Sequence, residues 1–301
     1  MNALGPVFAT LLLGAFFKRL ALPRAEFWAL AEPFIYFILL PALLIHKLAL
    51  ADISDFTLLP LAGAIGLTLV LTSAALWLCK AFWHTSAASF TSLYQGGIRF
   101  NTYIGLACSA QLFGDQGVLI AAVLMAIMIP SLNLFCILVF QISLQTAGFS
   151  WKKFIINLAK NPLILACFIG VFLNISGIGL PLGSDQVLDL LGRAALPLGL
   201  LAVGAALSPK VLLNHGYLIF SNSLFKLVVM PLIAVMVSYL LNLPQLMASV
   251  FILFCALPTA TSAYILARQL EGDADLMAAL ITGQTLLAFI SLPWVLEYLL
   301  P

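Results

Sequence analysis

Long apolar segments fill the chain and are separated by short polar connections. A helix that crosses a membrane needs about 20 consecutive, mainly apolar residues. Segments near this length cover residues 3–20, 33–50, 58–79, 89–112, 117–143, 161–178, 187–207, 217–241, 246–270 and 276–298. The pattern predicts an all-α polytopic membrane protein with ten transmembrane helices, spans 1 to 10, in a single transmembrane unit over residues 1–301.

Span 9 carries polar residues and a proline in its middle. These residues are Pro258, Thr259, Thr261 and Ser262. A proline removes one backbone donor and clashes with the preceding turn, so the helix is expected to break there. In hydrocarbon, the backbone groups freed by such a break must face protein or a water-filled cavity.

Span 4 has the same character. The expected helix-breaking residues are Gly96, Gly97 and Gly105, and the polar residues between them are Arg99, Asn101 and Thr102. Asn and Thr side chains compete with the backbone for hydrogen bonds, which weakens a helix. We therefore expect spans 4 and 9 to be broken near mid-depth and to cross there.

Composition supports a membrane protein and argues against several other classes. The chain is 63% hydrophobic and 8% charged, with a mean hydropathy of +1.16, whereas soluble domains carry about 25% charged residues. The net charge of +2 gives no reason to expect a nucleic-acid partner. The five cysteines lie in apolar runs without metal-ligand spacing, so neither a metal nor a cofactor is predicted.

Basic residues gather on one side of the predicted spans. That side carries Lys18, Arg19, Arg24, Lys80, Lys152, Lys153, Lys160, Lys210 and Arg268. The other side carries Lys47 with Asp52, Asp55, Asp115, Asp185 and Glu297. Because short loops rich in Lys and Arg stay in the cytoplasm, both termini are predicted to lie on the outer side.

The two halves of the chain resemble each other. Residues 5–17 match 161–173 at an offset of 156, and Pro41 matches Pro197 at the same offset. The ends of spans 4 and 9 match at an offset of 158. Each half, 1–143 and 152–301, holds five spans. An odd number makes the second half enter the membrane from the opposite side, so we expect an inverted repeat, a common plan of secondary transporters.

A crossing of broken helices has a defined chemistry. The N-terminal ends of half-helices present unpaired N–H groups and partial positive charge, which suits a carboxylate. The candidate substrate-binding residues there are Asn101, Thr102, Pro258, Thr259, Thr261 and Ser262. Alternatively, these side chains only repair the helix breaks.

Two basic residues lie well inside the spans, Arg99 in span 4 and Lys226 in span 8. A charge at a helix centre costs about 2.5–3.5 kcal/mol on insertion scales, so each requires an explanation. Either residue could neutralise an anionic substrate. Arg99 could instead bond broken-helix carbonyls, and Lys226 could pair with an acid or snorkel. Asp189 and Arg193, four residues apart, are expected to form a structural pair.

Several motifs together resemble the auxin efflux carrier family, which includes PIN-type auxin carriers and bacterial carriers linked to malate or malonate. They are PFIYFILLPALLIHKLALADI, NTYIG followed by FGD, ALPLGLLAVGAALSP, FKLVVMPLIA and LPTATSAYILARQ. The family's span-4 asparagine matches Asn101, and its span-9 proline matches Pro258. The proline that often follows the span-4 glycine is missing here, and Arg99 has no counterpart that the resemblance supplies.

The resemblance implies an architecture similar to that of bile-acid sodium symporters. It implies a scaffold of about 3–50 and 161–207, and a transport part of about 58–143 and 217–298 that shifts against the scaffold like an elevator. It also allows a homodimer. The connection at 144–160 is short, which is typical of a compact bacterial-type carrier in an inner membrane.

These features predict a secondary transporter of a small organic anion, a mono- or dicarboxylate. One alternative is a sodium-coupled organic anion symporter of the bile-acid type. Sodium needs clustered oxygen ligands, and the interiors of spans 4 and 9 contain no Asp or Glu. An intramembrane enzyme or a receptor is a further alternative, but the chain carries no recognisable nucleophile–base motif and no soluble output domain.

Overall fold

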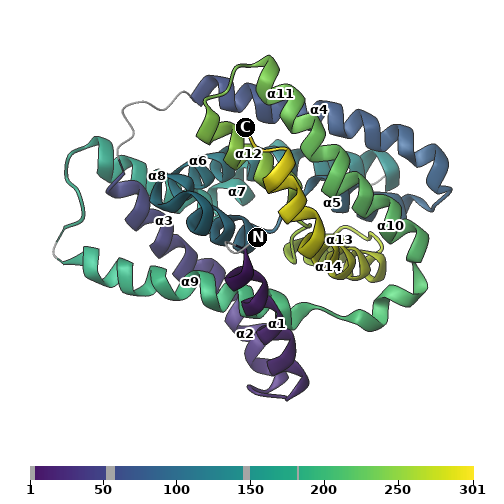
Figure 1. Cartoon of the computed structure of the whole chain (residues 1–301), viewed down its shortest axis with the longest axis horizontal. Helices are drawn as coiled ribbons and strands as arrows, with labels where there is room; N and C mark the ends of the chain where they lie inside the picture. The colour runs from purple at the N-terminus through teal and green to yellow at the C-terminus, as the bar shows by residue number, and fades with distance from the viewer. Residues whose placement is uncertain (1–3, 52–57, 145–149, 182) are drawn as a thin grey trace. The chain divides into compact units, whose positions relative to one another are not determined.

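The computed structural model describes residues 4–51, 58–144, 150–181 and 183–301, and every regular element in these ranges is helical (Figure 1). Asp52 and Asp55, which entered the charge comparison, lie outside the described residues. Six helical stretches within the described ranges are long and apolar enough to cross a membrane. They are Glu26–Ala49, Leu58–Trp83, Ala87–Leu144, Ser184–Ala206, Gly216–Leu240 and Ala274–Tyr298. Two shorter apolar helices, Pro162–Ile175 and Gln245–Ala256, accompany them.

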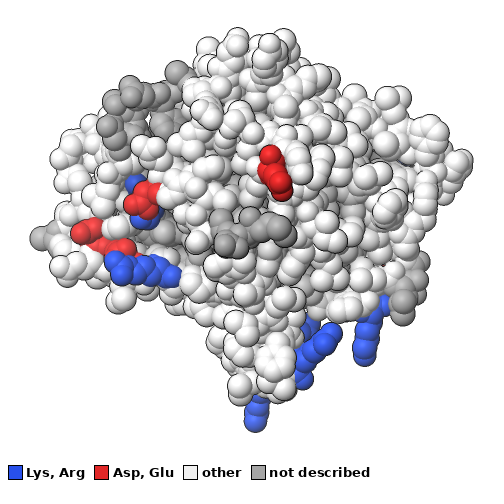
Figure 2. Space-filling view, viewed as in Figure 1, with Lys and Arg blue, Asp and Glu red and all other residues white. Residues whose placement is uncertain are grey.

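These helices confirm an all-helical, polytopic membrane protein, while the division into ten spans stays a prediction. Large apolar side chains stand on the outside of the protein, as lipid contact requires. Leu59 is 84% exposed and Leu78 is 72% exposed. Figure 2 shows a face that is almost free of charge apart from a few separate groups of side chains.

The chain divides into two compact units. Unit 1 comprises Met1–Phe56, Leu106–Ala126 and Trp151–Ala206. Its helices are α1 (Gly5–Arg19), α2 (Ala25–Phe34), η1 (Ile35–Leu39), α3 (Leu40–Ala49), α7 (Trp151–Ala159), α8 (Pro162–Ile175) and α9 (Ser184–Ala206), with part of α6 (Thr102–Leu144). Helix α1 packs along α9, and α3 packs along both α8 and α9 (Figure 1).

Glycines set the close approach of these helices. A Cβ atom added to Gly14 of α1 would collide with the backbone of Leu201, and one added to Gly204 of α9 would collide with the backbone of Leu11. A Cβ added to Gly170 of α8 would lie 2.7 Å from the Cβ of Leu48. Small residues let helix backbones touch, and such contacts are a main source of attraction between helices in lipid.

Unit 2 comprises Thr57–Gly105, Ile127–Ser150 and Leu207–Pro301. Besides the rest of α6, its helices are α4 (Leu58–Trp83), α5 (Ala87–Ile98), η2 (Pro209–Asn214), α10 (Gly216–Leu224), η3 (Phe225–Val229), α11 (Met230–Leu240), α12 (Gln245–Ala256), α13 (Ser262–Gln269) and α14 (Ala274–Tyr298). Helix α12 forms the centre of this unit, because every residue from 247 to 256 is buried. It packs against α11, α14 and η3.

Three irregular turns shape the long helices. The wider π-helical turns η1 and η3 each end two residues before a proline, Pro41 and Pro231. A proline lacks the N–H that a regular helix needs at that point, and a π-turn is one way to absorb the change. Helix α6 bends at Gly114, where φ is 61° and ψ is −150°. A residue with a side chain rarely adopts this conformation, so glycine is suited to the bend.

Candidate functional site

The first helix interruption lies between α5 and α6. Helix α5 ends at Ile98, Arg99 is extended with φ −75° and ψ 160°, and α6 begins at Thr102. The Oδ1 atom of Asn101 accepts hydrogen bonds from the backbone N–H groups of Tyr103, at 3.0 Å, and Ile104, at 3.2 Å. Asn101 therefore caps the N-terminus of α6 and satisfies donors that a helix start leaves free.

The second interruption lies between α12 and α13. Helix α12 ends at Ala256, and Leu257 is extended with φ −68° and ψ 148°. The residue before a proline is disfavoured in helical geometry, so Pro258 ends the helix at this point. Helix α13 begins four residues later, at Ser262.

The two interruptions touch each other inside unit 2. The backbone N–H of Asn101 donates a hydrogen bond of 2.8 Å to the carbonyl oxygen of Pro258. The rings of Phe100 and Phe254 pack edge to face, with their centroids 5.1 Å apart. Asn101 and Thr259 are both buried. Residues more than 150 positions apart in the sequence therefore form one buried junction, which we call the junction of residues 99–101 and 257–261.

The prediction that glycines break span 4 is wrong. Gly96 and Gly97 are helical residues of α5, and Gly105 is a helical residue of α6. An extended Arg99 and the Asn101 cap make the break instead. The glycines serve packing, because added Cβ atoms would lie 2.8 Å from Asn222 Oδ1 at Gly96, from Leu76 Cδ2 at Gly97 and from Leu257 Cδ1 at Gly105.

Gln284 of α14 contacts the backbone at both sides of the junction. Its Oε1 atom accepts a hydrogen bond of 2.8 Å from the N–H of Thr259. Its Nε2 atom donates to the carbonyl oxygen of Gly96 and to Oδ1 of Asn222, both at 3.0 Å. Asn222 in turn donates to the carbonyl oxygen of Leu93 at 2.8 Å. Gln284 and Asn222 are fully buried.

Neither amide was among the residues selected from the sequence. Gln284 and Asn222 lie in apolar segments that the charge and proline patterns did not mark. The available signal was polarity alone, because an amide inside a membrane span usually finds a hydrogen-bond partner in a neighbouring helix.

Lys226 of η3 is fully buried close to the end of α12. Its Nζ atom donates to the carbonyl oxygen of Cys255 at 3.1 Å and contacts Sδ of Met230 at 3.0 Å. Within the described part of the chain, no carboxylate lies within ion-pair distance of it. Its ammonium faces the carbonyl end of α12 instead, and the pairing with an acid is not found among the described residues.

Arg99 is half-buried, and its Nη1 atom lies 3.4 Å from Oε1 of Gln95. It also borders the thiol of Cys136. It bonds no carboxylate among the residues that the structure describes. Of the remaining candidates, Thr102 and Thr261 are half-buried and Ser262 is exposed.

Several buried polar atoms in and around the junction have no hydrogen-bond partner among the described residues. They are Nδ2 of Asn101, Oγ1 of Thr259, Nε2 of Gln95 and Oγ of Ser223. Leaving a buried polar group unpaired costs about 1–3 kcal/mol, so a bound ligand or water that pairs with these atoms is favoured. All four atoms can donate a hydrogen bond.

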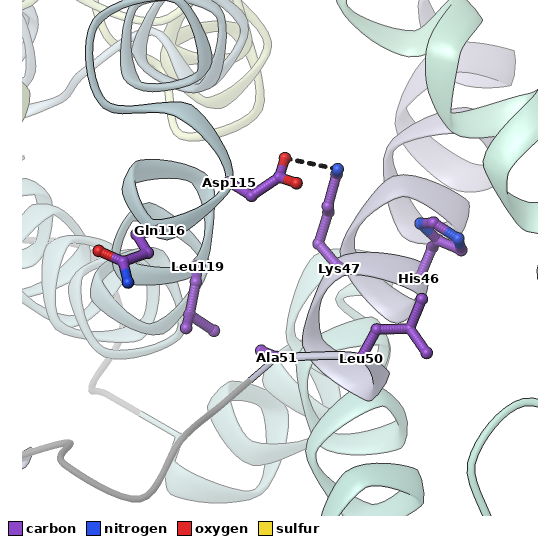
Figure 3. A pocket seen from close by; sticks show the side chains of 7 residues that line it. All are labelled: His46, Lys47, Leu50, Ala51, Asp115, Gln116 and Leu119. Atoms are coloured by element: carbon purple, nitrogen blue, oxygen red, sulfur yellow. Dashed lines mark hydrogen bonds and ion pairs between the residues drawn. The ribbon is translucent and has the colours of Figure 1, made fainter.

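Unit 1 contains a separate cavity of about 300 Å³ at the end of α3 (Figure 3). Lys47 from α3 points across it toward Asp115 of α6, and Nζ and Oδ1 are 2.6 Å apart. Next to Lys47, Nε2 of His46 lies 2.8 Å from Oδ1 of Asp185. The predicted structural pair is confirmed nearby, since Nη2 of Arg193 lies 2.6 Å from Oδ2 of Asp189.

Comparison of the sequence with known protein families identifies the family of this chain. Residues 1–296 match the membrane transport protein family. The chain belongs to this family. The resemblance to auxin efflux carriers is thereby confirmed over nearly the whole length of the chain.

Two relatives carry no more specific name than transporter. One, an uncharacterized transporter of Methanothermobacter thermautotrophicus, is 28% identical over 95% of this chain and 94% of its own length. Another, an uncharacterized transporter of Methanocaldococcus jannaschii, is 28% identical over 48% of this chain and 49% of its own length. In this membrane transport protein, the two positions that the resemblance singled out, Asn101 and Pro258, are bonded to each other through the backbone.

Proposed function

We propose that the protein is a secondary transporter that carries a small organic anion, a mono- or dicarboxylate, across the membrane by alternating access. The observation that carries the proposal is the bond between Asn101 N and Pro258 O, which joins two helix breaks in the interior of unit 2. Broken helices at membrane depth are a recurrent way of building a transporter's binding site.

The chemistry of the junction favours an anion. The N-terminal ends of α6 and α13 lie beside the two breaks, and helix N-termini favour negative charge. The unpaired groups of Asn101 and Thr259 can donate hydrogen bonds to a carboxylate. Arg99 and Lys226 add two cations in unit 2 without a carboxylate partner among the described residues. We assign the candidate binding roles of Thr102, Thr261 and Ser262 to the same site.

An inverted repeat of ten spans underlies this proposal. Such a repeat relates span 1 to span 6 and span 2 to span 7. The packing of α1 on α9 and of α8 on α3 then forms a symmetry-related pair of contacts. Gly14 and Gly170, which align at the offset of 156, both permit backbone contact in this pair. The pairing supports the repeat.

The same proposal divides the protein into a fixed scaffold and a transport part that moves. We place the scaffold at about 3–50 and 161–207, within unit 1, and the transport part at about 58–143 and 217–298. Of the transport part, Leu106–Ala126 packs within unit 1 and the rest falls in unit 2. We further propose an elevator-like shift of the transport part, a homodimer through the scaffold, and an inner membrane with both termini outside.

Proteoliposomes test the function directly. The purified protein is reconstituted, and uptake and exchange of labelled malate, malonate and indole-3-acetate are measured at two pH values with and without sodium. We expect saturable transport of at least one acid that Asn101→Ala reduces, without a requirement for sodium. Transport of none of a broad panel of organic acids by folded protein would contradict the proposal, and strict sodium dependence would favour the bile-acid type of symporter.

A further inference from the structure

We propose that Gln284 is a positioning residue that ties the two helix breaks together, so that they keep one geometry and move as one body. The inference concerns the binding site of the proposed function and rests on it for its effect on transport. The tie itself is a statement about hydrogen bonds and can be tested without any substrate.

Gln284 bonds backbone groups that the breaks leave free. Gly96 lies in the last turn of α5, where carbonyl groups lack helical partners, and Gln284 Nε2 donates to its oxygen at 3.0 Å. Thr259 lies between α12 and α13, and its N–H donates to Gln284 Oε1 at 2.8 Å. One side chain from α14 thus holds the end of one broken span and the unwound part of the other.

The orientation of both amides is fixed by the backbone at the two ends of the chain of bonds. The carbonyl of Leu93 can only accept, so it requires the NH₂ group of Asn222, and Asn222 Oδ1 then faces Gln284. The N–H of Thr259 can only donate, so it requires Oε1 of Gln284. The remaining NH₂ group of Gln284 then faces Asn222 and Gly96, where acceptors lie. Each amide has a single orientation that satisfies its neighbours.

Gly96 lets α5 come close to both amides. A Cβ atom at Gly96 would lie 2.8 Å from Asn222 Oδ1 and 3.6 Å from Gln284 Nε2. Gln284 and Asn222 are fully buried, so bulk water does not compete for their hydrogen bonds. Hydrogen bonds in such surroundings are stronger than in water.

The tie determines where the unpaired donors of the junction lie. Thr259 carries its free hydroxyl on the residue whose N–H is bonded to Gln284. Asn101, with its free Nδ2, is bonded through its own N–H to the neighbouring Pro258. Loss of the tie would let these donors separate, so a ligand that needs both would bind more weakly even though Gln284 does not touch it.

Hydrogen exchange tests the tie in protein without added organic acid. Gln284→Leu removes all three bonds, and we expect the amides of residues 257–261 to exchange at least about tenfold faster, since one or two lost bonds are each worth about 0.5–1.5 kcal/mol. Gln284→Glu keeps an acceptor for the N–H of Thr259 but loses the donor to the carbonyl of Gly96. We therefore expect a smaller increase in exchange at 257–261 than in Gln284→Leu, together with faster exchange at 97–101. Asn222→Ala provides a milder variant if Gln284→Leu folds poorly. Gln245→Leu, a matched change at an exposed glutamine of α12, serves as the control.

Binding tests the positioning role in the same variants. Malate, malonate and indole-3-acetate are titrated against folded protein well below its melting temperature. Where wild type binds one of them, we expect Gln284→Leu to weaken affinity by about tenfold and Gln284→Glu by less, whereas a merely stabilising residue would lower Tm and leave affinity unchanged. Unchanged exchange at 257–261 in folded Gln284→Leu overturns the tie. If no acid binds wild type, the proposed function loses support, and the exchange result still decides the tie.

Discussion

At the scale of single residues, mainly neutral side chains bond the backbone groups that the helix breaks leave free. Asn101 caps α6, Gln284 takes the N–H of Thr259, and Lys226 bonds the carbonyl of Cys255. Because hydrocarbon offers no water to these groups, every backbone atom freed by a break needs such a partner. Side-chain donors of Asn101 and Thr259 stay unpaired among the described residues, and in the proposed function they bind the ligand.

The cap of Asn101 can be separated from its role at the junction. Asn161 caps α8 in the same way, its Oδ1 accepting from the N–H groups of Leu163 at 3.0 Å and Ile164 at 3.3 Å. Replacing either asparagine with alanine should cost about 1 kcal/mol of stability. Thermal unfolding and proteoliposome uptake are measured for both. Asn101→Ala should also reduce uptake severalfold, whereas Asn161→Ala should not, and equal uptake in the two variants would contradict a binding role for Asn101.

The charge of Lys226 is the second residue to test. Lys226→Met keeps the length of the side chain and removes the cation, so affinity for an organic anion should fall by about tenfold, which corresponds to about 1.4 kcal/mol. Lys80→Met is the control, because Lys80 Nζ stacks 4.7 Å from the ring centroids of Trp77 and Phe90 rather than at the junction. Binding of the transported acid is measured by thermal shift. Equal affinity in Lys226→Met and wild type would show that this cation does not act on the anion.

At the scale of helices, glycines let the backbones of packed helices touch. Gly14 of α1 and Gly204 of α9 face backbone atoms of the opposite helix. Interiors are close-packed, so an added methyl group there must push the two helices apart.

A single methyl group should therefore distinguish these glycines from others. Gly14→Ala and Gly204→Ala are expected to destabilise the protein by about 1–3 kcal/mol or more through overpacking. Gly66→Ala is the matched control, since a Cβ at Gly66 of α4 meets no described residue within 4 Å and alanine favours a helix. Thermal unfolding in detergent measures all three. A Gly14→Ala variant as stable as Gly66→Ala would refute the close contact.

The sequence predicted the helices and one break well because those signals are local. Hydrophobic length indicated apolar helices long enough to cross a membrane, and Pro258 ended α12 through its own ring and its effect on Leu257. The roles of Gly96 and Gln284 were not predicted, because they depend on which helices pack together. From the sequence alone, a glycine suggests a helix break. Only the contact with Asn222 in the folded protein shows that Gly96 is a point of close approach between helices.

At the scale of the whole molecule, transport requires contacts that form in one state and break in another. The ion pair of Lys47 and Asp115 joins α3 to the part of α6 that follows the junction. In the proposed scheme these belong to the scaffold and to the transport part. Their side chains are 27% and 82% exposed, so the pair contributes under about 1 kcal/mol to stability, yet it can affect the rate of a movement that separates it.

A double-mutant cycle tests this contact. Lys47→Ala, Asp115→Ala and the double variant should change the melting temperature little, while their effects on the transport rate should be non-additive because both remove the same contact. Arg193→Ala is the control, because Arg193 and Asp189 pair within α9 and link no separate elements. Uptake rates in proteoliposomes are compared. Additive effects on the rate would mean that the pair does not act as a unit.

The wider turn of η3 gives the chain a surplus residue in the segment that carries Lys226. Each residue of a regular α-helix advances the helix by about 100°, so a one-residue deletion there would rotate the parts on its two sides against each other by roughly that angle. Deleting one residue between 225 and 229 would instead let the wide turn become regular α-helix, so that α10 and α11 keep nearly the same rotational register. At this place a one-residue deletion is a change of turn width rather than of phase, and we expect the chain to tolerate it better than a deletion within α10 or α11.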